Sequence, residues 1–183
     1  SQNRRRLLSL LVACLVALTI GRVLQLMLPF RQRPLHTVGL NFTLPHRLNS
    51  DVLHGLSSLP NDHGTLFFSL SMWLFLVSRP LGLLAFSHTI VVICLPRLYL
   101  GFHFATDLIA GALIGIASSY LLCSGKDRAG IGQRVLPWEK HYPAFFYSGL
   151  FLFTFELARL FADVRAIADF YFKVLRIFFG YSW

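Results

Sequence analysis

An arginine, a histidine and an aspartate with the spacing R-x5-H-x3-D stand where an apolar segment begins. They are Arg97, His103 and Asp107. His103 and Asp107 are four residues apart at a predicted helix start, so they share a face and the carboxylate can accept a hydrogen bond from one ring nitrogen. The other ring nitrogen is then free to act as a nucleophile. A guanidinium can hold two phosphate oxygens at once, so Arg97 completes a predicted phosphate site.

A second histidine, His63, follows a helix-start signal and precedes another apolar segment. Asn61 or Asp62 is a suitable N-cap for that helix, and the free backbone N–H groups of such a first turn attract anions. A histidine in that turn can protonate a leaving oxygen. Arg31 and Arg33 follow the first apolar segment and add positive charge. The pattern therefore predicts a second half of the phosphate site.

The elements that must position these groups are apolar segments. The chain has 183 residues, of which 55% are hydrophobic and 14% charged, too apolar for an ordinary soluble domain. No strand-like alternation appears, so we predict an all-α fold, a polytopic transmembrane helix bundle. Since a spanning helix needs about 20 mostly apolar residues, about five spans fit this chain. They lie at residues 7–28, 64–78, 81–95, 107–123 and 142–162, before an amphipathic C-terminal helix.

Two parts of the chain are expected. Residues 1–141 would form the catalytic membrane core, and residues 142–183 an additional span and the amphipathic C-terminal helix. Gly111 and Gly115 form G-x-x-x-G on the helix that carries Asp107, which predicts close helix packing there. Because the chain begins at Ser1, we leave open whether a segment precedes it.

The basic residues lie between the apolar segments and predict the topology. A net charge of +9 would suggest nucleic acid in a soluble protein, but membrane lipids explain it better here, so no nucleic-acid partner is expected. Basic residues 4–6 precede the first span and mark the cytoplasmic side. Alternation then places residues 31–63 and 97–103 outside. We therefore expect a multi-pass protein of the plasma (inner) membrane, whose active site faces the periplasm or the cell exterior.

The three cysteines lie inside apolar segments, and none pairs as C-x-x-C. Neither a disulfide framework nor a zinc site is indicated. We expect no metal and no cofactor.

These motifs, in this order, resemble the type 2 phosphatidic acid phosphatase (PAP2) superfamily, over roughly residues 22–123. The third family motif, S-R-x5-H-x3-D, matches at Arg97, His103 and Asp107, with Pro96 where serine is usual. The resemblance implies that His103 attacks phosphorus and forms a phosphohistidine, while Asp107 orients it. It also implies that no metal is needed.

The other two motifs match with departures. P-S-G-H matches at Pro60 and His63, but Asn61 replaces the serine and Asp62 the glycine. K-x6-R-P matches at Arg33 and the proline after it, while a leucine stands in place of the lysine. The resemblance implies that His63 protonates the leaving group and that two arginines hold the phosphate. The predicted substrate-binding residues are Arg31, Arg33, Asn61, Asp62 and Arg97.

The predicted function is an integral-membrane lipid phosphatase that removes phosphate from a lipid phosphate or pyrophosphate. The P-x-D-H form resembles the branch that acts on polyprenyl pyrophosphates, so undecaprenyl pyrophosphate comes first among substrates. Two alternatives stay open. One is a lipid phosphotransferase with the same phosphohistidine, and the other is a degenerate, non-catalytic member that binds lipid phosphate. The sequence leaves open the lipid, the choice between hydrolysis and transfer, and the oligomeric state.

Overall fold

Helices form all the regular structure in the described part of this computed structural model, which covers residues 2–37, 39–40, 42, 57–124, 137 and 139–161. No strand occurs within those ranges, so the prediction of an all-α fold is confirmed. By its contacts the chain divides into two units, residues 1–134 and 135–183. The predicted division of function after residue 141 stays a prediction.

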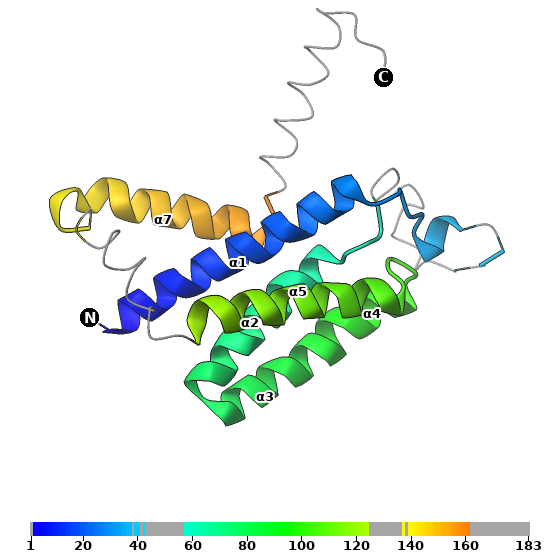
Figure 1. Ribbon diagram of the computed structural model, residues 1–183, viewed down its shortest axis with the longest axis horizontal. Coiled ribbons are helices and arrows are strands. Elements are labelled where there is room, and N and C mark those ends of the chain that lie inside the picture. Colours follow the sequence, from blue (N-terminus) through cyan, green and yellow to red (C-terminus); the bar gives the residue numbers. More distant parts are fainter. Residues whose placement is uncertain are drawn as a thin grey trace, which may run out of the picture. The chain divides into compact units, whose positions relative to one another are not determined.

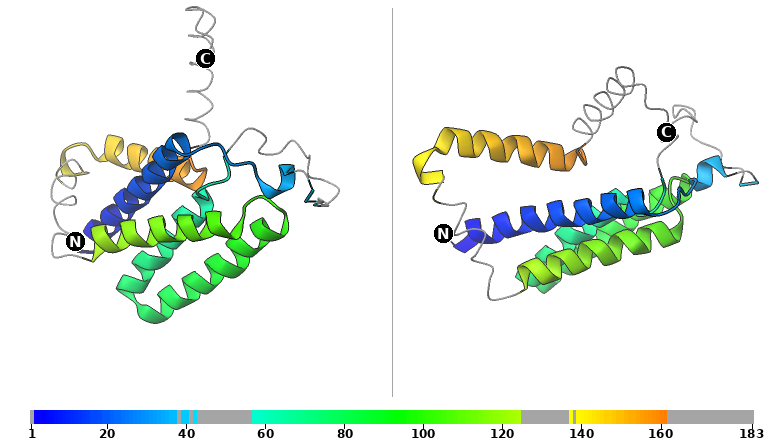
Figure 2. Two further views of the ribbon diagram at one scale, coloured as in Figure 1. Left: turned by 45° about the vertical axis from the view of Figure 1, so that its right-hand side comes forward. Right: turned by 45° about the horizontal axis from the view of Figure 1, so that its top comes forward.

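The first unit holds most of the described helices. In chain order they are α1 (Gln2–Met27), the short 3-10 helix η1 (Pro34–His36), α2 (Asp62–Val77), α3 (Arg79–His88), the π-helical turn η2 (Thr89–Cys94), α4 (Leu95–Tyr99) and α5 (Ala105–Cys123). Helix α2 packs against α5, α1 and α3 (Figure 1; Figure 2). The bundle is therefore built around α2.

Three of the described helices are long and apolar enough to cross a membrane, at Arg6–Met27, Arg79–Tyr99 and Ala105–Cys123. Two shorter apolar helices, Asp62–Val77 and Pro143–Ala158, coincide with the other two predicted spans. The chain is a polytopic membrane protein, and its apolar segments lie close to their predicted places.

The helix from Arg79 to Tyr99 is longer than expected. We predicted an end near residue 95; the next residue, Pro96, lacks the N–H that an α-helical hydrogen bond needs. In the structure the π-helical turn η2 precedes this proline and the chain continues helically through α4. Such turns shift the hydrogen-bond register locally, which lets the helix pass the proline. Arg97 therefore lies on helix α4.

Close approach of α2 and α5 depends on the predicted glycines. A Cβ atom on Gly111 would lie 2.7 Å from the carbonyl oxygen of Asn61, and one on Gly115 would lie 2.3 Å from that of Thr65. Both distances are below van der Waals contact, so only glycine allows this packing. Ser69 on α2 and Ser119 on α5 add a hydroxyl–hydroxyl hydrogen bond of 2.7 Å inside the same interface.

The second unit contributes one long described helix, α7 (Pro143–Ala158). Pro143 stands in its first turn, where the missing N–H costs no helical hydrogen bond. The Tyr147 hydroxyl donates a 2.6 Å hydrogen bond to Glu139, just before the helix. The predicted amphipathic C-terminal helix falls on residues 162–183, outside the described residues.

One end of the first unit brings together segments that are far apart in the sequence. The C-terminal end of α1, helix η1 and the turn between α4 and α5 lie there (Figure 1). The backbone N–H of Leu35 donates to the carbonyl of Gly101 at 2.8 Å, and that of Ser58 donates to Arg31 at 3.0 Å. These bonds connect the segment after α1 to the turn between α4 and α5 and to the residues before α2, so the predicted phosphate-binding segments lie together.

Candidate functional site

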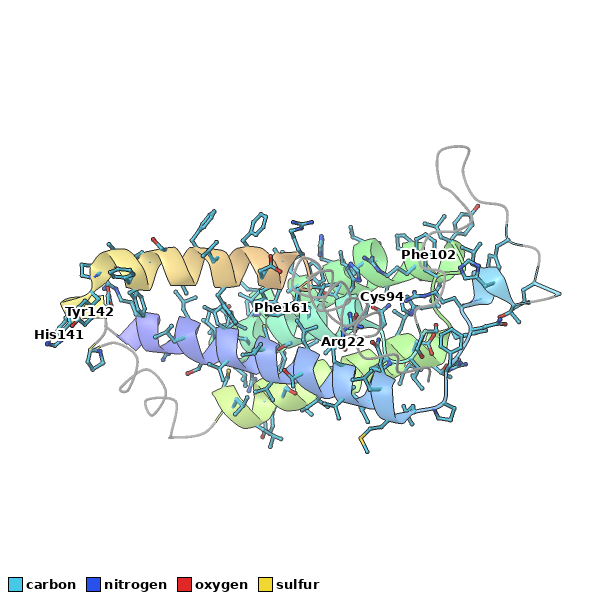
Figure 3. All side chains as sticks on the ribbon, turned by 90° about the horizontal axis from the view of Figure 1, so that it is seen from above. Arg22, Cys94, Phe102, His141, Tyr142 and Phe161 are labelled. Atoms are coloured by element: carbon cyan, nitrogen blue, oxygen red, sulfur yellow. The ribbon has the colours of Figure 1, made fainter. Side chains whose placement is uncertain are left out.

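His103 lies in the turn between α4 and α5. Gly101 opens this turn with a φ of +69°, a conformation that glycine adopts without strain, and Phe102, labelled in Figure 3, follows it. The imidazole is buried. Its Nδ1 lies 2.9 Å from the carbonyl oxygen of Ser58, and its Nε2 lies 3.0 Å from the Arg33 guanidinium.

Those two partners assign the tautomer of His103. A carbonyl oxygen only accepts hydrogen bonds, so Nδ1 must carry the proton and donate it to Ser58. A guanidinium only donates, so the Nε2 lone pair must face Arg33. The geometry thus leaves Nε2 without a proton, and its lone pair accepts a hydrogen bond from a buried positive charge.

Asp107 is fully buried in the first turn of α5 and accepts three hydrogen bonds. Its Oδ2 accepts from the Phe104 backbone N–H at 2.8 Å and, at short range, from the Ser58 hydroxyl. Its Oδ1 accepts from Arg31 at 2.8 Å. These donors stabilise a charged carboxylate inside the protein, which would otherwise be costly.

The direct hydrogen bond expected between His103 and Asp107 is absent. His103 Nδ1 and Asp107 Oδ2 are 3.8 Å apart, longer than a hydrogen bond. His103 lies in the turn before α5 begins, so the two residues do not share a helix face as predicted, and Ser58 supplies the closer acceptor for the ring and a donor for the carboxylate. Asp107 therefore acts on the imidazole through charge and through Ser58.

Ser58 is the site residue that sequence reasoning missed. It matches none of the three motifs and lies in a polar loop whose fold could not be predicted. Its hydroxyl and its carbonyl both point into the site, and it is fully buried. The only hint in the sequence was that Ser58 stands two residues before Pro60, the first residue of the second motif.

Arg33 and Arg31 both reach the site but contact different groups. Arg33 is buried, and its Nη1 atom also donates to the Phe102 carbonyl at 2.9 Å. Burial lowers the pKa of the Arg33 guanidinium from its usual value, while the negative charges of Asp62 and Asp107 oppose that shift. Arg31 instead donates to Asp107 and covers the ring of Phe104, with 4.5 Å from its Cζ to the ring centroid. Arg33 thus faces the His103 ring, while Arg31 neutralises the Asp107 carboxylate.

The residues of the second motif, 60–63, lie at the start of α2, next to the other predicted phosphate-binding segments. Asn61 is the N-cap, because its side-chain oxygen accepts from the Gly64 N–H at 2.9 Å. Its own backbone N–H donates to the Asp107 carbonyl at 3.1 Å. Its side-chain Nδ2 is buried and makes no hydrogen bond among the described residues. One buried donor at the start of α2 is therefore available to an anion.

His63 and Arg97 complete the set of predicted groups. His63 lies in the first turn of α2, where burial lowers the pKa of its imidazole to about 4, and the nearby positive charges of Arg97, His103 and Arg33 act in the same direction. The Arg97 guanidinium donates to the carbonyl of Ile93, one turn back on its own helix, at 2.8 Å. The two imidazoles and two arginines from distant segments therefore share one neighbourhood.

The remaining predicted residue, Asp62, contacts α1. Its carboxylate lies 2.6 Å from Arg22 and accepts from Gln25 at 3.2 Å. Within the described ranges, no group of three histidine, cysteine, aspartate or glutamate side chains is placed to hold a metal ion.

Comparisons with known proteins agree with this arrangement. The chain is 28% identical over 146 residues to the bacitracin transport permease protein BcrC of Bacillus licheniformis, an alignment that covers 76% of this chain and 66% of that relative. The chain thus spans just under two thirds of the relative's length. No solved structure was found to match. The family model of the PAP2 superfamily matches residues 6–130, which include all three motifs. The chain belongs to the PAP2 superfamily.

Proposed function

We propose that this protein is an integral-membrane lipid phosphatase that forms a phosphohistidine at His103. Membership of the PAP2 superfamily and the distant BcrC relative support a membrane lipid phosphatase family. The observation that carries the finer proposal is the pair of contacts on the imidazole. Ser58 holds the proton at Nδ1, and the Nε2 lone pair faces Arg33. A phosphate that takes over this Arg33 N–H donor would release the lone pair and lie against it.

The reaction has two steps. In the first, the His103 Nε2 atom bonds to phosphorus while the bond from phosphorus to the leaving oxygen breaks. His63, which takes up a proton from water when the negatively charged substrate enters, donates that proton to the leaving oxygen. The ring then carries a positive charge, which the Ser58 carbonyl and the nearby Asp107 carboxylate stabilise. In the second step, a water oxygen bonds to phosphorus while the bond from phosphorus to Nε2 of His103 breaks. His63, which lost its proton in the first step, takes a proton from the water, and phosphate leaves.

Arg33, Arg97 and Asn61 would hold the phosphate oxygens. Arg33 already lies against Nε2 of His103, and the Asn61 Nδ2 group is a buried donor without a hydrogen-bond partner among the described residues. Arg97 would exchange its bond to the Ile93 carbonyl for a bidentate contact with phosphate. Arg31 and Asp62, which were predicted to bind substrate, contribute through their partners, Asp107 and Arg22.

The substrate we propose is a polyprenyl pyrophosphate, with undecaprenyl pyrophosphate first. The P-x-D-H form of the second motif supports this choice. The site would face the periplasm or cell exterior of the plasma (inner) membrane, because basic residues precede the first span and the site lies at the other end of α1. Membrane lipids surround the protein in this scheme.

The test is phosphate release from a purified polyprenyl pyrophosphate by the full chain in lipid nanodiscs, with EDTA present. We expect turnover by the wild type and loss of at least about a thousandfold for His103→Ala, the typical scale for an essential catalytic group. His88→Ala is the matched control, since His88 is exposed on α3. Release that survives His103→Ala would contradict the proposal.

Labelled substrate separates the alternatives in the same assay. Free labelled phosphate indicates hydrolysis, whereas a labelled phospholipid that forms only with an added acceptor indicates phosphotransfer. Vanadate binding without any turnover would identify a non-catalytic member that binds lipid phosphate.

A further inference from the structure

A carboxylate stands next to His63 where the family motif has glycine. This residue, Asp62, would place a negative charge beside a site that must bind phosphate. Its effect does reach the site, because the charges of Asp62 and of Arg22 both act on Arg33, in opposite directions. Some feature of this chain must therefore offset the carboxylate.

Two side chains of α1 contact Asp62. The Arg22 Nη2 atom donates to Oδ2 of Asp62 at 2.6 Å, and the Gln25 Nε2 atom donates to Oδ1 of Asp62 at 3.2 Å. Arg22 and Gln25 are also bonded to each other. They are three residues apart on the helix and therefore lie on one face, from which the labelled Arg22 extends (Figure 3).

Gln25 also fixes the backbone before His63. Gln25 Nε2 also donates to the carbonyl of Pro60 at 2.8 Å. From the opposite side, the Asn61 N–H donates to the carbonyl of Asp107 on α5 at 3.1 Å. The turn that carries His63 is thus hydrogen-bonded to Gln25 of α1 and to Asp107 of α5.

We propose that Arg22 and Gln25 are positioning residues that hold the Asp62 carboxylate against α1, so that an incoming phosphate meets a neutral ion pair and not a free negative charge. The inference rests on the proposed phosphate chemistry of this site. It assigns a role to Arg22 that differs from phosphate contact: Arg22 acts through Asp62. It also explains how a chain with aspartate at this position could still bind an anion.

The inference predicts an asymmetry between the two members of the ion pair. Arg22→Ala leaves a half-buried carboxylate unneutralised near the site, so phosphate affinity should fall. Asp62→Asn removes the charge itself, so phosphate affinity should persist. The double variant Arg22→Ala/Asp62→Asn should recover the affinity that the single arginine variant lost. A purely structural ion pair would show equal losses for both single variants and no recovery.

Orthovanadate, which mimics pentacovalent phosphorus, is the probe, and its dissociation constant can be measured by calorimetry on the full chain in nanodiscs. We expect R22A to weaken vanadate binding by about tenfold, the effect of one nearby charge at moderate dielectric. D62N and the double variant should stay within about threefold of the wild type. Arg79→Ala is the matched control, because Arg79 is exposed at the start of α3.

One further variant and the wild-type reference distinguish failure of this inference from failure of the proposed function. Arg22→Gln retains a hydrogen-bond donor for Asp62 without the charge, so it should lose vanadate affinity even if R22A fails to fold. A wild type that does not bind vanadate would overturn the proposed function together with this inference. A wild type that binds, with R22A and R22Q binding equally well, would overturn the inference alone. Equal losses in R22A, D62N and the double variant would do the same.

Discussion

The Nδ1 atom of His103 lies 2.9 Å from the carbonyl oxygen of Ser58. The Ser58 hydroxyl is bonded to the Asp107 carboxylate, so a single residue links the imidazole to the buried charge. Backbone and side chain therefore have separate tasks: the carbonyl fixes the tautomer, and the hydroxyl fixes the carboxylate. These tasks can be tested apart, because a substitution removes the hydroxyl but keeps the carbonyl.

Ser58→Ala is expected to lower kcat by about tenfold and leave KM within about threefold. The tautomer of His103 survives through the retained carbonyl, but Asp107 loses one of its donors. Stability should fall by about 1 kcal/mol, the usual value of one hydrogen bond. Steady-state phosphate release and thermal unfolding measure both effects. Ser87→Ala is the control, since Ser87 is exposed and bonds only its own helix at Leu83. An unchanged kcat in S58A would refute the role given to the hydroxyl.

Asp107→Ala is expected to destabilise the protein more than Arg31→Ala. Removing the carboxylate deprives Arg31, Ser58 and the Phe104 N–H of their acceptor, a loss of about 3 kcal/mol at about 1 kcal/mol for each bond. Removing the arginine leaves Asp107 with two donors, and the arginine itself is partly exposed, so about 1 kcal/mol is expected. Chemical denaturation in a mild detergent gives both values. Equal losses would mean that the ion pair dominates this site.

Gly115→Ala tests the packing of α5 on α2. The new Cβ would lie 2.3 Å from the Thr65 carbonyl oxygen, so the helices must separate, at a cost of about 2 kcal/mol. Gly149→Ala is the matched control, because a Cβ on Gly149 meets no atom within 4 Å. Thermal unfolding should distinguish the two variants. Similar melting temperatures would contradict the close-contact account of the G-x-x-x-G pattern.

The sequence allowed prediction of the helices, because they follow from local patterns. Apolar runs placed the spans, but the spacing of His103 and Asp107 did not place both on one helix face, since His103 lies in the turn before α5. The helix that carries Arg97 extended further than predicted, since a π-helical turn compensates for Pro96. Such a turn depends on tertiary packing, and the residues around it carry no distinct signal.

The contacts inside the site could not be predicted in the same way. Ser58 reaches His103 and Asp107 from a loop, and loop conformations depend on contacts with distant segments. The pairing of Arg22 with Asp62 joins residues 40 positions apart. Arg31 could equally have faced phosphate or a carboxylate on its charge alone. Spacing thus identified the groups, while their partners required the three-dimensional arrangement.

Arg97→Lys tests whether the guanidinium serves the phosphate or only its own helix. Lysine keeps the charge and can still donate to the Ile93 carbonyl, so the fold should be retained. It cannot present two parallel N–H groups, so a bidentate phosphate contact would be lost and KM should rise by about tenfold. The melting temperature should match that of the wild type, and Arg79→Lys should change neither quantity. If KM stays constant in R97K while Arg97→Ala lowers the melting temperature, the guanidinium serves the Ile93 carbonyl alone. Arg33 would then be the principal phosphate ligand, because it already lies 3.0 Å from the Nε2 atom of His103.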